Sequence, residues 1–211
     1  YLMKKFLEDN PSVGIVGPKI FKPDGNLQKI QFGIKYDLKG KYLNILSKTI
    51  FSYFTKHFMN EFYALDKDLT KPLEVFAVFG CSFMMSEKCA RDITPFDENT
   101  FLYEEELIIG VTMEKYGYKT VIFPESQIIH AHGQSTKNVK AFSYTCLVES
   151  EIYYLRRYIN SSVLSILPLY LIRTLKYLFL AIKYKDFRKN LTSYFKRTIP
   201  KFRIKERKFI H

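Results

Sequence analysis

The hydropathy pattern of this sequence changes near residue 139, and this change constrains the fold more than any other feature. Before it, short apolar runs of strand length alternate with amphipathic stretches of helical period. Such alternation at short spacing is typical of an α/β sheet domain. After it, the helical period continues to the end of the 211-residue chain. We therefore expect an α/β domain over residues 1–138 and a helical segment over residues 139–211.

Charge is distributed as unevenly as the hydropathy pattern. Residues 1–150 contain 18 Lys and Arg against 18 Asp and Glu, whereas residues 151–211 contain 15 against 3. The whole formal net charge of +12 therefore belongs to the last 61 residues. A hydrophobic content of 47% is enough for a packed core and excludes collagen-like, low-complexity and largely disordered chains. The charge predicts an acidic partner for the C-terminal segment rather than for the whole chain.

The cysteines and the first residues bear on the cellular compartment. Cys81, Cys89 and Cys146 are odd in number and show no Cys-x-x-Cys spacing. This argues against a disulfide framework or a structural zinc site and favours a reducing compartment. Residues 1–5 are charged and amphipathic, unlike the apolar core of a secretory signal peptide. Because the sequence begins with Tyr, we expect either a processed start or a piece of a longer protein.

Periodicity and turn signals predict the elements that precede residue 139. They are helices over residues 2–9, 87–92 and 104–116, and strands over residues 13–20, 75–85, 120–124 and 127–130. The strand over residues 75–85 is expected to be interrupted at Gly80. The last helix is expected to bury Leu107, Ile108 and Val111 and to end at Gly117. Residues 34–72 are rich in aromatic residues, and we interpret them as a long variable excursion.

The C-terminal segment has the pattern of a helix that lies in a membrane interface. The uncharged stretch between Arg157 and Arg173 has 15 residues and contains Pro168, fewer than the roughly 20 that span a bilayer. Beyond it, one side of the helix is apolar and the opposite side is basic. The apolar side has Leu171, Leu175, Leu178 and Ile182, and the basic side has Arg173, Lys176 and Lys183. The expected partner is an anionic membrane surface.

Nucleic acid is an alternative partner for the same segment. Residues 194–205 interleave basic and aromatic side chains, which can contact phosphates and stack on bases. No nucleic-acid-binding fold signature accompanies them, and the apolar side of residues 171–182 suits lipid better. We therefore expect a membrane rather than a nucleic acid.

An acidic cluster is the strongest candidate for chemistry. Glu104, Glu105 and Glu106 stand at the first turn of a predicted helix, where the macrodipole favours ionised carboxylates. The like charges of the cluster oppose that effect and raise at least one proton affinity. A carboxylate of this kind can act as a general base toward a hydroxyl. The alternative is that the cluster only reflects the preference of acidic residues for a first helical turn.

A second candidate lies after the last predicted strand. His130 and His132 occupy positions i and i+2, which point to one face of a strand and suit a divalent metal or a phosphate oxygen. Gly133 and Ser135 then offer a flexible backbone and a hydroxyl for an anion. Exposed or structurally bonded histidines are the alternative interpretation.

Several motifs in order resemble the C-terminal half of a family 2 glycosyltransferase, most closely the rhamnosyltransferase-like branch that builds cell-surface polysaccharides. The resemblance covers residues 2–135. It is carried by Asn10-Pro-x-Val13-Gly-Ile-Val-Gly-Pro-Lys19, Asp24-Gly25, the apolar run that reaches Gly80, Phe96-Asp97-Glu98, Phe101-Leu-Tyr-x-Glu105-Glu106, Gly117-Tyr118, Pro124 and His130-x-His132-Gly-x-Ser135. A basic helical segment after the sheet domain is also common in those enzymes.

The resemblance implies a GT-A fold and an inverting transfer of a sugar from a nucleotide-sugar donor to a hydroxyl of a polysaccharide or lipid-linked acceptor. The family's Glu-Asp pair falls on Glu105-Glu106, so Glu106 would be the catalytic base beside Glu105. The donor and acceptor sites would include Gly80, Asp97 and Ser135. A divalent metal, Mg or Mn, would contact His130 and His132. The expected location is the cytoplasmic face of the cell membrane.

The sequence also departs from the family pattern. Ile108 and Thr112 stand where many relatives have an Asp and an Arg. The nucleotide-binding half and its Asp-x-Asp metal carboxylates are expected before residue 1, since Asp66-x-Asp68 is out of order and is interpreted as a solvated acidic pair. The alternative function is therefore a non-catalytic module that binds a membrane surface.

Overall fold

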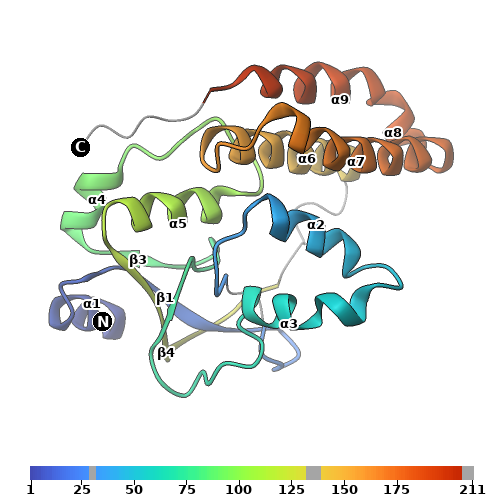
Figure 1. Cartoon of the computed structure of the whole chain (residues 1–211). Coiled ribbons are helices and arrows are strands. Elements are labelled where there is room, and N and C mark those ends of the chain that lie inside the picture. The colour runs from blue at the N-terminus through green and yellow to red at the C-terminus, as the bar shows by residue number, and fades with distance from the viewer. Residues whose placement is uncertain (29–31, 132–138, 206–211) are drawn as a thin grey trace. The chain divides into compact units, whose positions relative to one another are not determined.

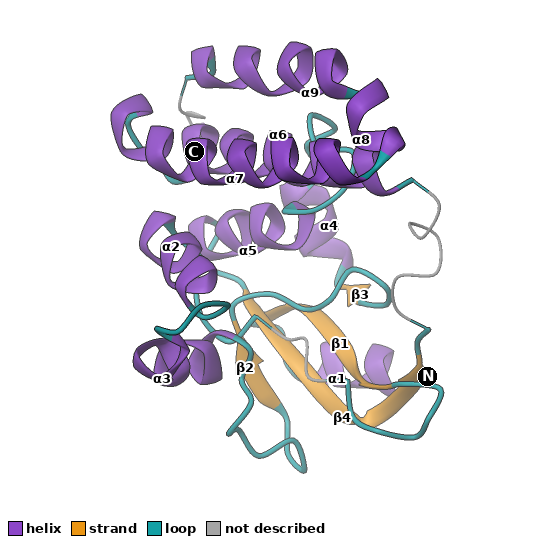
Figure 2. Cartoon of the chain, turned by 90° about the vertical axis from the view of Figure 1, so that its right-hand side faces the viewer, coloured by secondary structure: helices purple, strands orange, loops and turns teal. Residues whose placement is uncertain are grey.

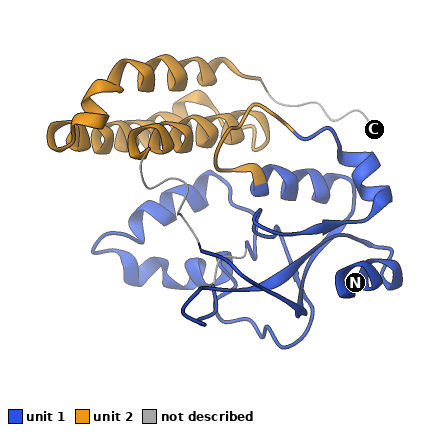
Figure 3. Cartoon of the chain, turned by 180° about the vertical axis from the view of Figure 1, so that it is seen from behind, with its two compact units in different colours: residues 1–96, 106–132 blue, residues 97–105, 133–211 orange. Residues whose placement is uncertain are grey.

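The structure is a computed structural model that describes residues 1–28, 32–131 and 139–205. Among the candidate site residues, His132, Gly133 and Ser135 lie outside the described part. The chain divides into two compact units, which Figure 3 colours separately. Unit 1 comprises residues 1–96 and 106–132, and unit 2 comprises residues 97–105 and 133–211.

Unit 1 is an α/β unit built on a mixed sheet (Figure 1). Its elements are α1 (Leu2–Asp9), β1 (Val13–Phe21), α2 (Leu38–Leu46), α3 (Ser52–Phe62), β2 (Leu73–Val75), β3 (Met84–Met85), α4 (Glu87–Ile93), α5 (Glu105–Lys115) and β4 (Lys119–Ile129). The described strands form a four-stranded sheet in the order β2-β4-β1-β3. The central pair, β1 and β4, is parallel, and both edge strands are antiparallel to their neighbours.

Helices cover both faces of this sheet, as Figure 2 shows. On one face, α1 packs through an apolar cluster that contains Leu7, Val16 and Val121. On the other face, α4 and α5 pack through a cluster that contains Ile15 and Ile122. For this reason β1 is buried over most of its length and β4 is buried over residues 120–124, whereas the second half of β4 is partly exposed.

The expected fold class is confirmed as an α/β protein with a mixed sheet, followed by a helical C-terminal region. The helices expected over residues 2–9, 87–92 and 104–116 and the strand expected over residues 13–20 all form, with ends that shift by one residue or less. The predicted stripe of α5 is buried, and Gly117 ends the helix with a positive φ of 72°.

The strand predicted over residues 75–85 is wrong for most of its length. Only β2 and β3, at the two ends of this apolar run, pair with the sheet. The backbone between them finds partners elsewhere: the N–H groups of Phe76 and Ala77 both donate to the carbonyl of Phe32, and that of Gly80 donates to the side chain of Glu106. An apolar run of strand length therefore crosses the unit without joining the ladder.

The two strands predicted over residues 120–124 and 127–130 form a single strand, β4. Its pairing with β1 continues on both sides of an irregularity, because Pro18 is opposite Phe123 and the next residue, Lys19, is opposite Gln127. The residues between Phe123 and Gln127 are therefore extra residues in β4 that have no partner in β1, and they form a bulge in β4.

The variable excursion of residues 34–72 contains a helical hairpin, α2 and α3. Asp37 caps α2, since its side chain accepts a hydrogen bond from the N–H of Gly40. The base of the hairpin packs around Phe62, which is 1% exposed and stacks on Tyr36 with ring centroids 3.9 Å apart. Phe58 stacks on the same two rings. The aromatic residues of this excursion thus form a local core of their own.

Unit 2 is helical and has an aromatic core. Its helices are α6 (Lys140–Arg157), α7 (Val163–Lys183), α8 (Lys185–Lys189), α9 (Leu191–Thr198) and the 3-10 helix η1 (Ile199–Arg203). Tyr177 and Tyr194 are fully buried and stack with centroids 4.2 Å apart. The hydroxyl of Tyr194 lies 2.8 Å from that of Thr174, and the hydroxyl of Tyr170 lies 3.0 Å from that of Thr198. The hydroxyls of these two tyrosines therefore have hydrogen-bond partners inside the core.

The segment 97–105 belongs to unit 2 because it is bonded to α6. The carboxylate of Asp97 accepts hydrogen bonds from the hydroxyls of Tyr153 and Tyr158, at 2.5 and 2.6 Å. Farther along, the hydroxyl of Tyr103 lies 2.5 Å from that of Ser143. The hydroxyl of Ser150 also donates to the carbonyl of Leu102. These contacts fix the segment that leads into α5.

Helix α7 has two apolar faces. One face packs inside unit 2 and contains Ile166, Leu169, Tyr170, Tyr177 and Ala181. The other face is exposed and contains Leu164, Leu167, Leu171, Ile172, Leu175, Leu178, Phe179 and Ile182. In the described part of the chain, α7 is long and apolar enough to cross a membrane by length and composition alone. It is longer than the uncharged stretch in the sequence, because Arg173 and Lys176 lie within the helix.

Candidate active site

Glu106 is held at the first turn of α5 by the backbone of Gly80. The N–H of Gly80 donates to Oε1 of Glu106 at 3.0 Å. A Cβ placed on Gly80 would lie 2.8 Å from the same oxygen, closer than a real Cβ contact allows. A side chain at position 80 would therefore displace the carboxylate. This close approach explains why the position suits glycine.

Gly80 reaches Glu106 because the segment after β2 runs along α5. Phe76 lies against Gly110, where an added Cβ would be 2.6 Å from the ring of Phe76 and 2.8 Å from its carbonyl oxygen. Four residues later, Gly80 meets Glu106, which is one helical turn before Gly110. Two glycines, one on each chain segment, thus allow the segment and the helix to lie in close contact.

The charge of Glu106 extends to the neighbouring Cys81. Cys81 is an exposed residue. Its thiol is partly buried, and this burial is the largest cause of the rise in the pKa of the thiol. The negative charge of Glu106 raises that pKa further. The thiol is therefore kept protonated beside the carboxylate, and Cys81 is a reporter of the charge on Glu106.

His130 lies in the same corner of unit 1. It follows β4 directly, and its N–H donates to the carbonyl of Phe21 at 2.8 Å. Its Nδ1 is 3.2 Å from Oε1 of the buried Gln28. Its ring meets the edge of Phe79, with centroids 5.5 Å apart. Phe79 directly precedes Gly80, which is bonded to Glu106. Glu106 and His130 therefore both contact the segment that contains Gly80.

Asp97 and Glu105 are placed in unit 2. Burial alone would raise the pKa of Asp97, but the hydrogen bonds from Tyr153, Tyr158 and Asn99 outweigh it and lower the pKa to about 2. The carboxylate of Asp97 thus acts as a structural acceptor in the packing of residues 97–105 on α6. The structure gives this residue a role that its place in the motif did not suggest.

The two residues before α5 adopt an uncommon backbone conformation. Tyr103 and Glu104 have φ angles of 71° and 70°, in the left-handed region that favours glycine. Each such residue costs on the order of 1–3 kcal/mol, and such costs are often found near functional sites. The hydrogen bond of the Tyr103 hydroxyl with Ser143 helps to hold this conformation. The sequence carries no local signal for it.

The described residues do not form a metal centre by themselves. Within residues 1–28, 32–131 and 139–205, no group of three or more His, Cys, Asp or Glu could hold a metal ion. His130 can offer one imidazole nitrogen, which is fewer than the ligands that a divalent metal requires.

Two hollows lie along α5 in the described part of unit 1. A small apolar cavity of about 10 Å³ is lined by Val78, Phe83, Glu106 and Ile109 and is too small for a sugar. A groove of about 470 Å³ lies farther along α5, beside the edge strand β2. Its lining includes two ion pairs, Lys35 with Glu114 at 2.6 Å and Lys119 with Glu74 at 2.8 Å. Sequence reasoning missed this groove, because its walls come from residues far apart in the chain.

Comparisons with known proteins leave the family open. No protein-family model matches the chain, and no curated protein matches it.

Proposed function

We propose that unit 1 is the acceptor side of an inverting glycosyltransferase similar to family 2, with Glu106 as its general base. The observation that carries this proposal is the hydrogen bond between Gly80 and Glu106, since a Cβ at position 80 would push the carboxylate out of this place. It orients a carboxylate at the N-terminal end of a helix. The strained backbone at Tyr103 and Glu104 precedes it directly.

The chemistry asked of Glu106 is a single proton transfer. The carboxylate takes the proton of an acceptor hydroxyl while the hydroxyl oxygen bonds to the anomeric carbon of the donor sugar. The bond between that carbon and the nucleotide diphosphate breaks, and its electron pair leaves with the diphosphate. Attack on the face opposite the leaving group inverts the anomeric carbon. Gly80 contributes by fixing the direction of the carboxylate.

The test is made on the full-length gene product that contains this sequence. Glu106→Gln should abolish sugar transfer, a loss of about 100-fold or more for a general base, while binding of the nucleotide sugar is retained. Glu114→Gln is the matched control, because Glu114 is on the same helix in an exposed ion pair with Lys35. Turnover that survives in Glu106→Gln would rule out this assignment of the base.

A second candidate function is peripheral binding to an anionic membrane, which also suits a polysaccharide or lipid-linked acceptor at the cytoplasmic face. The observation that favours it is the exposed apolar face of α7, in which Leu175 and Phe179 are each 66% exposed. Lys176 and Lys183 are exposed beside that face. The sequence pattern predicts a basic side opposite to it, but that side contains the buried Tyr177. Basic residues that flank an apolar face complement anionic head groups.

The opposite face of α7 favours a helix in the interface over one that spans the bilayer. Tyr177 on that face is fully buried, and Arg173 is bonded to the buried Glu151 of α6. A spanning orientation would break this packing and would expose the pair to lipid, at a high cost for charged groups. Nucleic acid is disfavoured for a related reason, since Tyr194 is buried and Arg197 is paired with Glu149.

Flotation of the intact chain with liposomes tests this candidate. We expect binding to vesicles that contain phosphatidylserine and weaker binding to vesicles of phosphatidylcholine alone, with a decline at high salt. Binding that is independent of lipid charge would count against the basic residues. Competition by RNA at equal salt would favour a nucleic-acid partner instead.

A further inference from the structure

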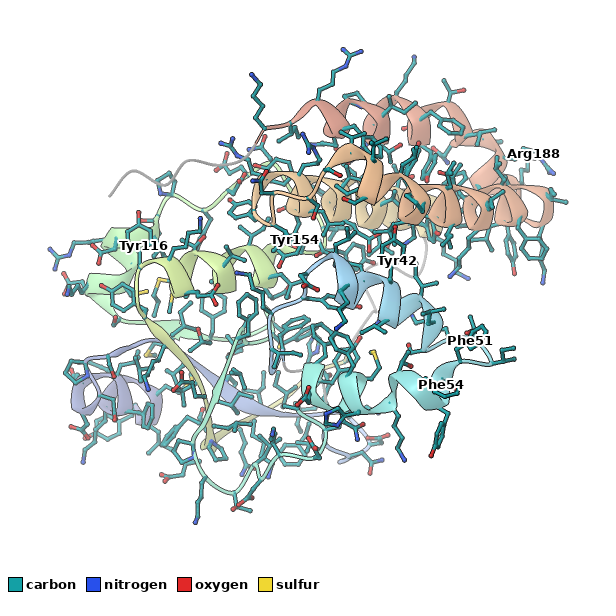
Figure 4. The ribbon with its side chains drawn as sticks, viewed as in Figure 1. Tyr42, Phe51, Phe54, Tyr116, Tyr154 and Arg188 are labelled. Atoms are coloured by element: carbon teal, nitrogen blue, oxygen red, sulfur yellow. The ribbon has the colours of Figure 1, made fainter. Side chains whose placement is uncertain are left out.

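The tip of the α2–α3 hairpin exposes a cluster of large apolar side chains. Ile50 is 89% exposed, Tyr53 82% and Phe54 80%, and Phe51 is 49% exposed. Figure 4 labels Phe51 and Phe54 at this tip, where both point away from the hairpin. We define the hairpin tip as residues 48–56.

The packing of the hairpin does not account for this cluster. Its local core lies at the base, where Tyr36, Phe58 and Phe62 stack. The tip is held by polar contacts: the hydroxyl of Thr49 accepts from the N–H of Phe51 and donates to the carbonyl of Leu46. The backbone of the tip is thus ordered locally while its large side chains face outward. Four large apolar side chains together at one tip form an exposed patch that indicates a binding surface.

The charge around the tip indicates what it binds. Residues 38–60 contain Lys39, Lys41, Lys48 and Lys56 and no Asp or Glu. Lys41 is buried, with its ammonium 4.4 Å from the centroid of the Tyr36 ring, whereas the other three lysines are exposed. Such a tip complements an anionic bilayer. Its apolar end suits the acyl chains, and the lysines around it suit the anionic head groups.

We propose that the hairpin tip inserts into the interface of an anionic membrane. Tyr53 suits the boundary, because its ring is apolar and its hydroxyl is polar. Ile50, Phe51 and Phe54 enter the acyl region, and Lys48 and Lys56 bind the head groups. A second copy of the chain is a poorer occupant, because two tips in contact would bring their lysines together with no acidic residue in either segment to offset them.

The inference stands on unit 1 alone and is separate from both proposed functions. It requires neither sugar transfer by Glu106 nor lipid binding by α7. The outer face of α7 and the hairpin tip belong to different units, so variants at the two surfaces distinguish their contributions.

The first experiment uses the absence of tryptophan from the chain. Tyr53→Trp places a single fluorophore at the tip, and Tyr116→Trp places one at an exposed position after α5, at the other side of unit 1 in Figure 4. Vesicles of phosphatidylcholine and phosphatidylserine with brominated acyl chains should shift the emission of the Tyr53→Trp variant to the blue and quench it. The emission of the Tyr116→Trp variant should change little. A fluorophore at the tip that does not respond to these vesicles overturns the proposal.

The second experiment measures the contribution of the tip to binding. The double variant Ile50→Ser and Phe54→Ser should weaken partition into the same vesicles by about tenfold or more, since each apolar side chain loses its burial in lipid. Its unfolding temperature should not change, because both side chains are exposed in the free chain. The same weakening should be measured when Leu175→Ser and Phe179→Ser are also present. Unchanged partition of the double variant into the vesicles overturns the proposal. A blue shift of the Tyr53→Trp emission that increases with protein concentration in the absence of lipid also overturns it, because the tip would then bind a second copy of the chain.

Discussion

Arg173 and Glu151 form a two-point ion pair inside unit 2. Nε and Nη2 of the guanidinium each donate to a different carboxylate oxygen, and both distances are 2.9 Å. The Glu151 side chain is 2% exposed and that of Arg173 is 12% exposed. The pair joins α6 to α7 on the packed side of α7. Charges buried in this way are tolerated only when the partner is present.

Removal of one partner should therefore be costly. Glu151→Gln should lower the free energy of unfolding by about 3–5 kcal/mol, because it leaves a buried guanidinium without its counter-charge. Denaturation in urea, followed by circular dichroism, measures the change. The control is Glu87→Gln, in the exposed pair between Glu87 and Arg91, for which we expect less than about 1 kcal/mol. Equal effects in both variants would contradict the role of burial.

The carboxylate of Asp97 should make the stability of unit 2 dependent on acid. Its pKa is lowered from 3.8 to about 2 in the folded chain, so its ionised form stabilises the fold above the unfolded pKa. That contribution is lost as the pH falls through about 2. Asp97→Asn should be less stable than the parent at neutral pH, and the difference should shrink between about pH 4 and about pH 2. A difference that stays constant over this range would contradict the assignment.

Cys81 should report the charge of Glu106 without any assay of activity. Glu106→Gln removes a negative charge that raises the pKa of the Cys81 thiol, so the pKa should fall and more thiolate should form at a given pH. The rate of reaction with a thiol reagent should rise accordingly. Cys89 and Cys146 are buried and should react slowly. Glu114→Gln serves as the control. Equal reaction rates in the parent and in Glu106→Gln would show that the charge of Glu106 does not act on the Cys81 thiol.

The two apolar faces of α7 should respond differently to the same substitution. Leu175→Ser, on the exposed face, should weaken liposome binding and leave the unfolding temperature nearly unchanged. Tyr177→Ser, on the packed face, should cost about 3–5 kcal/mol of stability, because it opens a cavity beside Tyr194. Flotation and thermal denaturation of both variants separate the two roles. Loss of stability in Leu175→Ser would indicate that the outer face is packed.

The sequence predicts elements well where the local pattern and the tertiary packing agree. The buried strand at residues 13–20 and the stripe of α5 are of this kind, because their periodicity matches the faces that the sheet covers. Residues 76–83 are the opposite case. They are as apolar as a central strand, yet the partner of the Gly80 N–H is a side chain 26 positions later, and no local pattern reveals such a partner.

The candidate site divides in the same way. The family resemblance assigns roles to Gly80, Glu106 and His130, and in the structure Gly80 is bonded to Glu106 while the ring of the neighbouring Phe79 contacts His130. Asp97 was singled out by the same reasoning, but its hydrogen bonds come from Tyr153 and Tyr158, more than 50 residues later. The groove beside β2 was missed for a similar reason, because the periodicity of one segment does not reveal distant partners.

Unit 2 is assembled from two stretches of chain, and a part of unit 1 separates them. A fragment that begins at residue 139 omits Asp97 and Tyr103 and leaves Tyr153, Tyr158 and Ser143 without those hydrogen-bond partners. We therefore expect that residues 139–205 alone do not form the complete fold of unit 2. A fusion of residues 139–205 to a different domain would lack these partners, so the segment 97–105 should be transferred together with α6.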